Sequence, residues 1–257
     1  MSDPHRPSGP TTHFGFDSVP LDEKGRRVRA VFESVATRYD LMNDLMSGGI
    51  HRLWKADFLA AVAPRPGERL LDVAGGTGDI ALGLLAAAGG PADGTEVTVV
   101  DLTAEMLTAG RDRALDQGIV AGIDWIVGDA ERLPIADRSV DVYTIAFGLR
   151  NVTRVAAALS EAHRVLKPGG RFYCLEFSHV VLPPLAWLYD LYSFNVLPQL
   201  GQLVAGNRDA YRYLVESIRR CPAQKDLVGL IEAAGLERVR YRNLSGGIAA
   251  IHSAWRL

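Results

Sequence analysis

Two aspartates flank a glycine-rich stretch in the first third of the chain. Asp72 lies near the end of a short apolar run, Asp79 begins an alanine-rich run, and Gly75, Gly76 and Gly78 lie between them. Without side-chain bulk this backbone can turn sharply, and a ligand can approach it closely. An ordinary tight turn would also use glycines, so the glycines alone say little. The two acids add information because they make the turn negatively charged.

This negative charge indicates which ligand the turn would accept. A helix N-terminus attracts phosphate, but the pyrophosphate of a dinucleotide would here lie close to Asp72 and Asp79, which repel it. S-adenosylmethionine instead carries an ammonium and a sulfonium group beside its adenosine. The charge pattern therefore favours S-adenosylmethionine over a dinucleotide.

Two further acids follow predicted strands and suit an adenosine. Asp101 closes the second predicted strand, where a carboxylate can accept both ribose hydroxyls. Asp129 follows the third strand and can accept a hydrogen bond from the adenine amino group, while Ala130 leaves room for the ring. Alternatively, Asp101 could cap the helix that follows it, and Asp129 could be an ordinary acidic residue of a turn. We favour the nucleotide interpretation because all three strand ends agree with it.

The composition and two missing motifs exclude other classes. The net charge of −2 and the pI of about 6.3 argue against a general nucleic-acid binder. No tyrosine is followed by lysine four residues later, which argues against a short-chain dehydrogenase. Residues 146–151 read AFGLRN, not the Pro-Pro-aromatic motif of amino-methylating enzymes of nucleic acids. Cys174 and Cys221 lack metal-ligand spacing, so no metal site is expected, and they suggest a reducing compartment.

The chain begins with helices that precede the first predicted strand. Residues 1–20 show no periodic pattern and are expected to form a flexible arm. Apolar residues recur at helical spacing from residue 26 until Gly48 and Gly49, and again over residues 50–62. We expect these two helices to cap the sheet.

Strands and helices then alternate, which predicts parallel strands joined by right-handed crossovers. Strands are expected at residues 70–73, 96–101, 123–127, 140–147 and 171–177, and helices at 80–88, 103–117, 154–166, 210–220 and 224–234. Residues 237–244 and 248–255 flank Ser245-Gly246-Gly247, which predicts a terminal hairpin.

The whole pattern predicts an α/β fold in one domain over residues 21–257. Its Rossmann-like sheet would be mostly parallel, with a C-terminal antiparallel hairpin and a helical N-terminal cap. An aromatic, proline-containing segment interrupts the alternation and is expected to form a lid insertion at about residues 180–222. Its aromatic side chains would either wall an apolar pocket or pack within the lid itself.

Motifs over nearly the whole chain resemble one family, the ubiquinone/menaquinone biosynthesis C-methyltransferases, which are class I methyltransferases. The glycine loop would fit any class I methyltransferase, whereas the GLRN stretch at 148–151 and the N-terminal motifs are much more specific. The matching stretches are Thr11–Phe16, Tyr39–Asp44, His51–Lys55, Leu71–Asp79, Ala146–Val152, Arg164–Gly170, Leu175–Ser178, Tyr211–Leu214, Glu216–Arg219 and Gly247–His252.

The resemblance implies methylation of a ring carbon of a prenylated benzoquinol or naphthoquinol. S-adenosylmethionine would be the donor and S-adenosylhomocysteine the product. The cofactor positions of the family fall on Thr77, Asp101, Asp129 and Ala130. Ala146 stands where relatives often have serine, so one contact to the cofactor would be lost.

The chemistry of such a substrate suggests the catalytic candidates. A ring carbon is a poor nucleophile until a quinol hydroxyl is deprotonated or strongly polarised. Arg150 and Asn151 follow the fourth strand, where the acceptor should lie. Arg150 cannot act as a base, but it can hold a quinolate oxygen or polarise a water, with Asn151 orienting the ring. Tyr39 and His51 are further candidates; a capping aromatic and a helix-starting surface residue are their alternatives.

The expected partners follow from the substrate class. They are the prenylated quinol, the cytoplasmic membrane surface through peripheral contact, other quinone-biosynthesis proteins, and a second copy in a homodimer; nucleic acid is not among them. We expect a cytoplasmic protein, with the inner membrane face as its point of contact. The alternative function is a non-catalytic scaffold that binds S-adenosylmethionine or a nucleotide in a quinone-synthesis complex.

Overall fold

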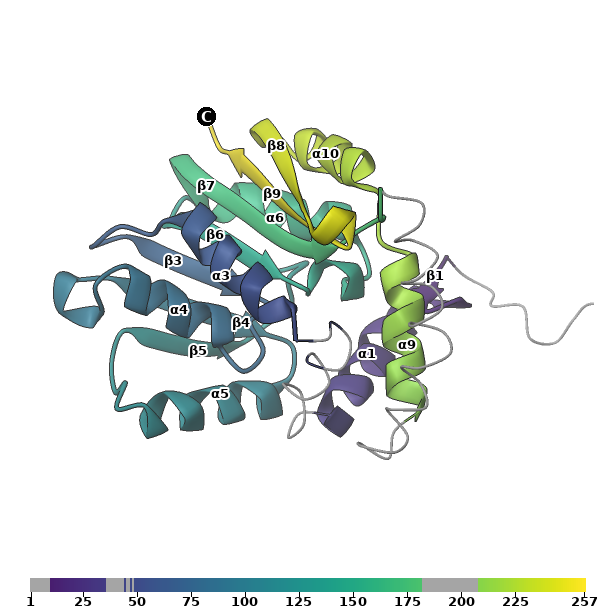
Figure 1. Ribbon diagram of the computed structural model, residues 1–257, viewed down its shortest axis with the longest axis horizontal. Helices are drawn as coiled ribbons and strands as arrows, with labels where there is room; N and C mark the ends of the chain where they lie inside the picture. Colours follow the sequence, from purple (N-terminus) through teal and green to yellow (C-terminus); the bar gives the residue numbers. More distant parts are fainter. Residues whose placement is uncertain (1–9, 36–43, 45–46, 48, 182–207) are drawn as a thin grey trace, which may run out of the picture.

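A seven-stranded sheet forms the centre of the computed structural model, which describes residues 10–35, 44, 47, 49–181 and 208–257 (Figure 1). The strand order is β5-β4-β3-β6-β7-β9-β8. The strands are β3 (Arg69–Val73), β4 (Glu96–Asp101), β5 (Ile123–Val127), β6 (Val140–Ala146), β7 (Leu166–Phe177), β8 (Glu237–Leu244) and β9 (Ala249–Trp255).

The first five strands of the sheet are parallel, and the last two run antiparallel to their neighbours. β3 pairs with β4 on one side and β6 on the other, whereas β9 pairs antiparallel with both β7 and β8. The strand order therefore reverses at β3. In open α/β sheets ligands bind at such a reversal, beyond the carboxyl ends of the strands.

Helices cover both faces of the sheet because its strands are apolar on both sides. Leu70 packs in one core cluster with α3 and α4, while Leu71 and Val73 pack in the other with α6 and α10. The described helices from residue 51 onward are α3 (His51–Val62), α4 (Asp79–Ala87), α5 (Ala104–Asp116), α6 (Val155–Val165), α9 (Arg208–Arg219) and α10 (Gln224–Ala233), with short 3-10 turns η2 (Pro91–Asp93), η3 (Leu149–Asn151) and η5 (Ser245–Gly247).

The expectation of a flexible arm up to residue 20 is wrong for residues 11–20. They form an antiparallel hairpin of β1 (Thr11–Phe14) and β2 (Asp17–Pro20), which leads directly into α1 (Leu21–Val35). The ring of Phe14 stacks on Tyr213 of α9 at 4.2 Å, and Val19 is buried. These tertiary contacts hold strands that are too short to show an alternating pattern.

Most element bounds agree with the sequence, and the main difference lies in β7. The expected break at residues 167–170 is instead part of the strand, which begins at Leu166. Gly169 donates its N–H to the carbonyl of Arg256, and Arg256 donates back to Gly170. The C-terminal end of the chain therefore supplies the pairing that keeps this proline- and glycine-containing stretch extended.

The described part of the chain does not include most of the predicted lid. Residues 182–207 lie outside the described residues, whereas α9 packs against α1 and contributes Tyr211 and Leu214 to the core. None of the described helices has the length and apolar character needed to cross a membrane.

Candidate cofactor-binding and active site

The turn after β3 is held in a conformation that favours glycine. Gly76 and Gly78 have φ of 55° and 73°, and Ala74 adopts the same left-handed region at 52°. A Cβ added at Gly75 would lie 2.7 Å from Val99 and 2.8 Å from Asp72 Oδ2. Val99 and Asp72 therefore pack closely against the turn and leave no room for a side chain at Gly75. The left-handed conformation of Ala74 is strained for a non-glycine residue, and such strain is typical of functional sites.

Asp101 is fixed at the end of β4 by two backbone donors. The N–H of Gly76 donates to Oδ2 at 2.9 Å, and the N–H of Thr103 donates to Oδ1 at 2.8 Å. Burial raises the pKa of Asp101, although these donors act in the opposite direction. The carboxylate thus ties the glycine turn to β4 and keeps a fixed orientation at the edge of a cleft.

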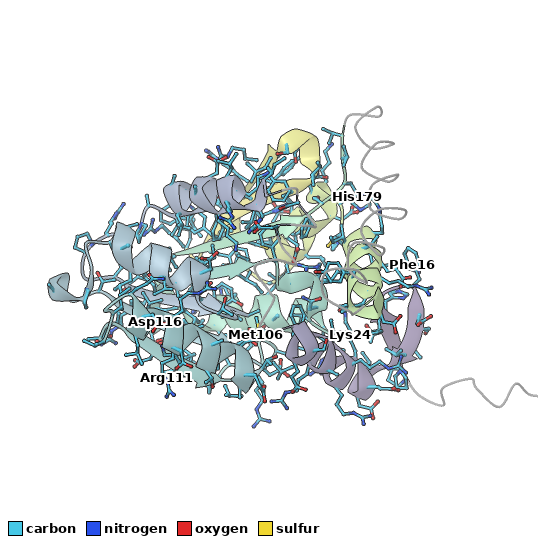
Figure 2. All side chains as sticks on the ribbon, turned by 60° about the horizontal axis from the view of Figure 1, so that its bottom comes forward. Phe16, Lys24, Met106, Arg111, Asp116 and His179 are labelled. Atoms are coloured by element: carbon cyan, nitrogen blue, oxygen red, sulfur yellow. The ribbon has the colours of Figure 1, made fainter. Side chains whose placement is uncertain are left out.

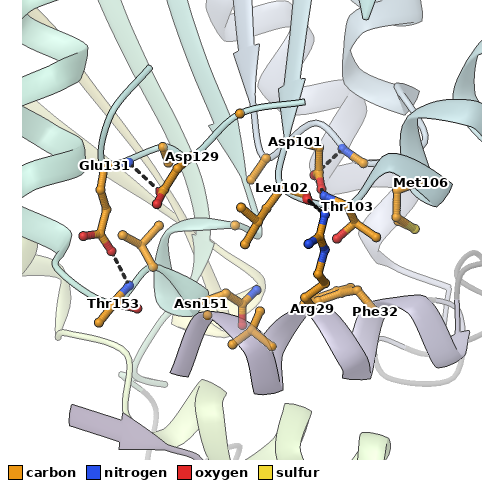
Figure 3. Close-up of a pocket in the computed structure, with 18 of the residues that line it drawn as sticks. Arg29, Phe32, Asp101, Leu102, Thr103, Met106, Asp129, Glu131, Asn151 and Thr153 are labelled. Carbon is orange, nitrogen blue, oxygen red and sulfur yellow. Dashed lines mark hydrogen bonds between the residues drawn. The ribbon is translucent and has the colours of Figure 1, made fainter. Parts of the chain in front are cut away.

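The cleft has a volume of about 800 Å³ and lies over the carboxyl ends of β3, β4 and β6 (Figure 3). The predicted residues that line it are Gly76, Asp101, Asp129, Ala130 and Asn151, whereas Gly75, Gly78, Thr77 and Asp72 are not among its lining residues. Figure 3 shows Asp101 and Asp129 on opposite sides of the opening.

Asp129 and Ala130 lie in the turn after β5. Asp129 Oδ1 accepts the N–H of Glu131 at 2.9 Å, and this local hydrogen bond orients the side chain. Glu131 in turn accepts the N–H of Thr153 at 2.9 Å, which links this turn to the one after β6. The two turns that would surround an adenine are therefore held together.

Asp72 lies beneath the glycine turn and is 1% exposed. Thr144 donates to its Oδ1 at 2.8 Å, and Oδ2 accepts no hydrogen bond from the described residues. Burial raises the pKa of Asp72 to about 7, and the charges of Asp101 and Asp79 add to the effect. A buried carboxylate with one unused oxygen is suited to a cationic ligand group.

Asp79 has less influence on the ligand than its position in the sequence implied. Lys55 and Arg113 form ion pairs with it at 2.5 and 3.8 Å, and Lys55 lowers its pKa. The negative charge near the turn therefore comes mainly from Asp72 and Asp101.

Arg150 and Asn151 lie in η3 and point to different places. Asn151 lines the cleft, and its Oδ1 accepts a hydrogen bond from the Tyr213 hydroxyl at 3.0 Å. Arg150 donates to Glu176 at 2.9 Å and to the Phe147 carbonyl, is 5% exposed in its side chain, and does not line the cleft. The structure thus brings Asn151, but not Arg150, to the cleft, and their catalytic roles stay predictions.

Of the two remaining catalytic candidates, the structure describes only His51. His51 is buried at the start of α3, where Ser47 Oγ lies 2.9 Å from its Nδ1, and burial lowers its pKa. It is not among the residues that line the cleft. Tyr39 lies outside the described residues.

Helix α1 supplies cleft residues that the sequence reasoning missed. Gly25, Val28, Arg29 and Phe32 line the cleft from the side opposite the strand ends. The guanidinium of Arg29 donates to the Leu102 carbonyl at 3.0 Å, and Figure 3 shows it pointing toward Asp101. The spacing of apolar residues had indicated a capping helix, but it did not indicate which of its faces covers the ligand.

This sheet, its glycine turn and the acids at its strand ends define a class I S-adenosylmethionine-dependent methyltransferase. Solved structures share the fold, among them a S-adenosylmethionine-dependent methyltransferase from Aquifex aeolicus (TM-score 0.58, 17% identity, covering 79% of this chain and 89% of that one). Another is phosphoethanolamine N-methyltransferase 2 from Haemonchus contortus in complex with S-adenosyl-L-methionine (TM-score 0.57, 15% identity, 79% and 52%).

The chain belongs to the ubiE/COQ5 methyltransferase family, whose model matches residues 21–256. It is similar to the ubiquinone/menaquinone biosynthesis C-methyltransferase UbiE of Cereibacter sphaeroides, with 57% identity over 96% of this chain and 97% of that protein. The protein of the same name from Methylobacterium nodulans is 59% identical, with 96% and 97% covered.

Proposed function

We propose that the protein transfers a methyl group from S-adenosylmethionine to a ring carbon of a polyprenyl quinol. The product would be a menaquinol, a methylated methoxy-benzoquinol, or both. The observation that carries the proposal is the whole-length match to relatives named for this reaction, on a chain whose cleft has the features of a methyltransferase.

The cleft residues fit this cofactor. Asp101, held by the Gly76 N–H, would accept the ribose hydroxyls, and Asp129 and Ala130, which line the cleft, would contact the adenine. When it is ionised, Asp72 would supply, through its unused oxygen, a negative charge beneath the turn for the amino group of the methionine part. The bound cofactor supplies an electrophilic methyl group on a positively charged sulfur.

The residues around η3 would act on the acceptor. Asn151 is held by Tyr213 at the wall of the cleft, where its amide can bind a quinol oxygen and orient the ring. Arg150 is neutralised by Glu176, so its contribution would be to hold η3 in place or to polarise a water. Much of the rate would come from alignment of donor and ring carbon in a site that α1 shields from water.

The protein would meet its substrate at the membrane. A prenyl tail partitions into lipid, and we therefore propose peripheral contact of a cytoplasmic protein with the inner membrane face. Contact with other quinone-biosynthesis proteins and formation of a homodimer are further parts of this proposal.

The test is methyl transfer from labelled S-adenosylmethionine under anaerobic, reducing conditions. Short-tailed demethylmenaquinol and the demethylated methoxy-benzoquinol are offered separately, with Asn151→Ala as the variant and the remote Asp124→Ala as its control. Label in at least one quinol, reduced in Asn151→Ala only, supports the proposal. Binding of the cofactor by calorimetry without label in either quinol would instead support the non-catalytic scaffold.

A further inference from the structure

A second cavity lies on the other side of the turn that follows β6. It is lined by residues of the β1–β2 hairpin, α1, α9 and the segment from η3 to the start of α6. Figure 2 labels Lys24 and Phe16 in this region. Val152 and Thr153 line both this space and the cofactor cleft, so the two are neighbours. We refer to it as the hairpin cavity.

The charged side chains that line the hairpin cavity are all basic. Lys24, Arg150 and Arg220 line it together with the imidazole of His13, and none of the described aspartates or glutamates does. Lys24 is buried, with 7% of its surface exposed, whereas Arg220 and His13 are exposed. Basic groups thus extend from the mouth of the cavity to its interior.

Lys24 has no acidic partner among the residues that the structure describes. Its Nζ donates to the carbonyl of Val152 at 2.9 Å and to that of Arg150 at 3.5 Å. An ammonium group has three donors, and burial of a charge without a counter-ion is costly. Burial accordingly lowers the pKa of Lys24. An anion in the cavity would offset this cost.

The carboxylates on the surrounding elements are engaged elsewhere. Each of them forms an ion pair with an arginine, so none of the described carboxylates pairs directly with Lys24 or Arg220. The pairs are Glu176 with Arg150 at 2.9 Å, Glu216 with Arg212 at 2.7 Å, and Glu131 with Arg154 at 2.6 Å. The charge of Glu131 still favours the charged form of Lys24, and the guanidinium of Arg220 lies over the ring of Phe16 at 5.7 Å.

We propose that the hairpin cavity binds a phosphate group, with Lys24 and Arg220 as its main contacts. Lys24 comes from α1, Arg220 directly follows α9, and His13 adds a donor from the hairpin. A tetrahedral anion with oxygens on all sides can accept hydrogen bonds from such separate directions, whereas a planar carboxylate cannot do so equally well. The phosphate belongs to a small molecule or to the headgroup of an anionic phospholipid; both present the same chemistry.

The test is a calorimetric titration of the full-length protein with inorganic phosphate. A parallel arm measures sedimentation with phosphatidylcholine vesicles that contain or lack phosphatidic acid. The variants are Lys24→Met, Lys24→Arg and Arg220→Gln, and Arg65→Gln is the matched control because this exposed arginine does not line the cavity. Circular dichroism verifies that each variant is folded.

We expect saturable phosphate binding that weakens at least about tenfold in Lys24→Met, because a charge-assisted hydrogen bond is lost. Arg220→Gln should weaken binding less, and Lys24→Arg and Arg65→Gln should keep it. Vesicle binding that requires phosphatidic acid and Lys24 would identify the lipid as the source, and phosphate binding without it would identify a small molecule. Absence of saturable binding in both arms, or equal binding by folded Lys24→Met, would overturn the proposal. Both readouts are independent of methyl transfer.

Discussion

Asp72 and Asp101 lie near the ends of adjacent strands, and both are carboxylates in a largely buried setting, yet their surroundings differ. Backbone N–H groups hold both oxygens of Asp101. A threonine hydroxyl holds one oxygen of Asp72, and none of the described residues donates to the other. The carboxylate of Asp101 is therefore fixed in orientation, whereas Asp72 keeps one oxygen that a donor can still reach, and a cationic donor would interact with it most strongly. We propose that one cofactor, with a ribose for Asp101 and an ammonium group for Asp72, uses both carboxylates.

Replacement of Asp101 should have the largest effect on cofactor binding. Asp101→Ala removes the hydrogen bonds to the ribose hydroxyls and also releases the glycine turn. A hydrogen bond to a charged group is worth about 1.5–3 kcal/mol. We expect S-adenosylhomocysteine binding to weaken about 100-fold by calorimetry. Asp124→Ala, on an exposed site of β5, is the control; a similar loss there, or none in Asp101→Ala, would contradict the assigned role.

Replacement of Asp72 should have a smaller effect that depends on pH. With the pKa raised to about 7, Asp72 is mostly neutral below pH 7 and negatively charged above it. Wild-type affinity for S-adenosylmethionine should therefore rise between pH 6 and 8. Asp72→Asn should bind about tenfold more weakly at pH 8 and show no such rise. An equal pH profile in both proteins would show that another group titrates.

The same carboxyl should make the stability of the protein pH-dependent. Its folded-state pKa of about 7 lies above the ordinary aspartate value of 3.8, so the folded state binds more protons between these values. The free energy of unfolding should therefore fall as pH rises from about 4 to about 7. Asp72→Asn should lose this decline in urea titrations; a decline of the same size would assign it to other groups.

Thr144 tests whether the hydroxyl partner of Asp72 matters. Thr144→Val keeps the shape of the buried side chain and removes the donor at 2.8 Å. The pKa of Asp72 should rise further, and affinity at pH 7 should fall about fivefold, as expected for one hydrogen bond of about 1 kcal/mol. A restored affinity at pH 8 would separate this effect from simple misfolding.

Replacement of Arg29 should have the smallest effect on cofactor affinity. Its guanidinium is solvent-exposed and donates to one carbonyl at the rim of the cleft, and such contacts contribute less than about 1 kcal/mol. Arg29→Gln should change cofactor affinity by less than about fivefold in calorimetry. A loss as large as that of Asp101→Ala would mean that α1 binds the cofactor directly and does not only cover it.

The strands of the sheet were predictable because each is an apolar run that ends at a turn. Asp101, Asp129 and Ala130 were predictable for the same reason, since carboxyl ends of parallel strands share one edge. The β1–β2 hairpin and the cleft-facing side of α1 were not, because contacts such as Phe14 with Tyr213 join residues far apart in sequence. Nor does sequence order show that Arg150 pairs with Glu176 while its neighbour Asn151 lines the cleft.

The most direct test of the central claim is the position of the transferred methyl group. The reaction is run with S-adenosylmethionine carrying a ¹³C-labelled methyl group and each reduced quinol, and the product is examined by NMR. A signal from a methyl group on a ring carbon is predicted for at least one quinol. A labelled methyl group found only on oxygen, or only on unrelated acceptors, would contradict the assignment of this protein as a quinol C-methyltransferase.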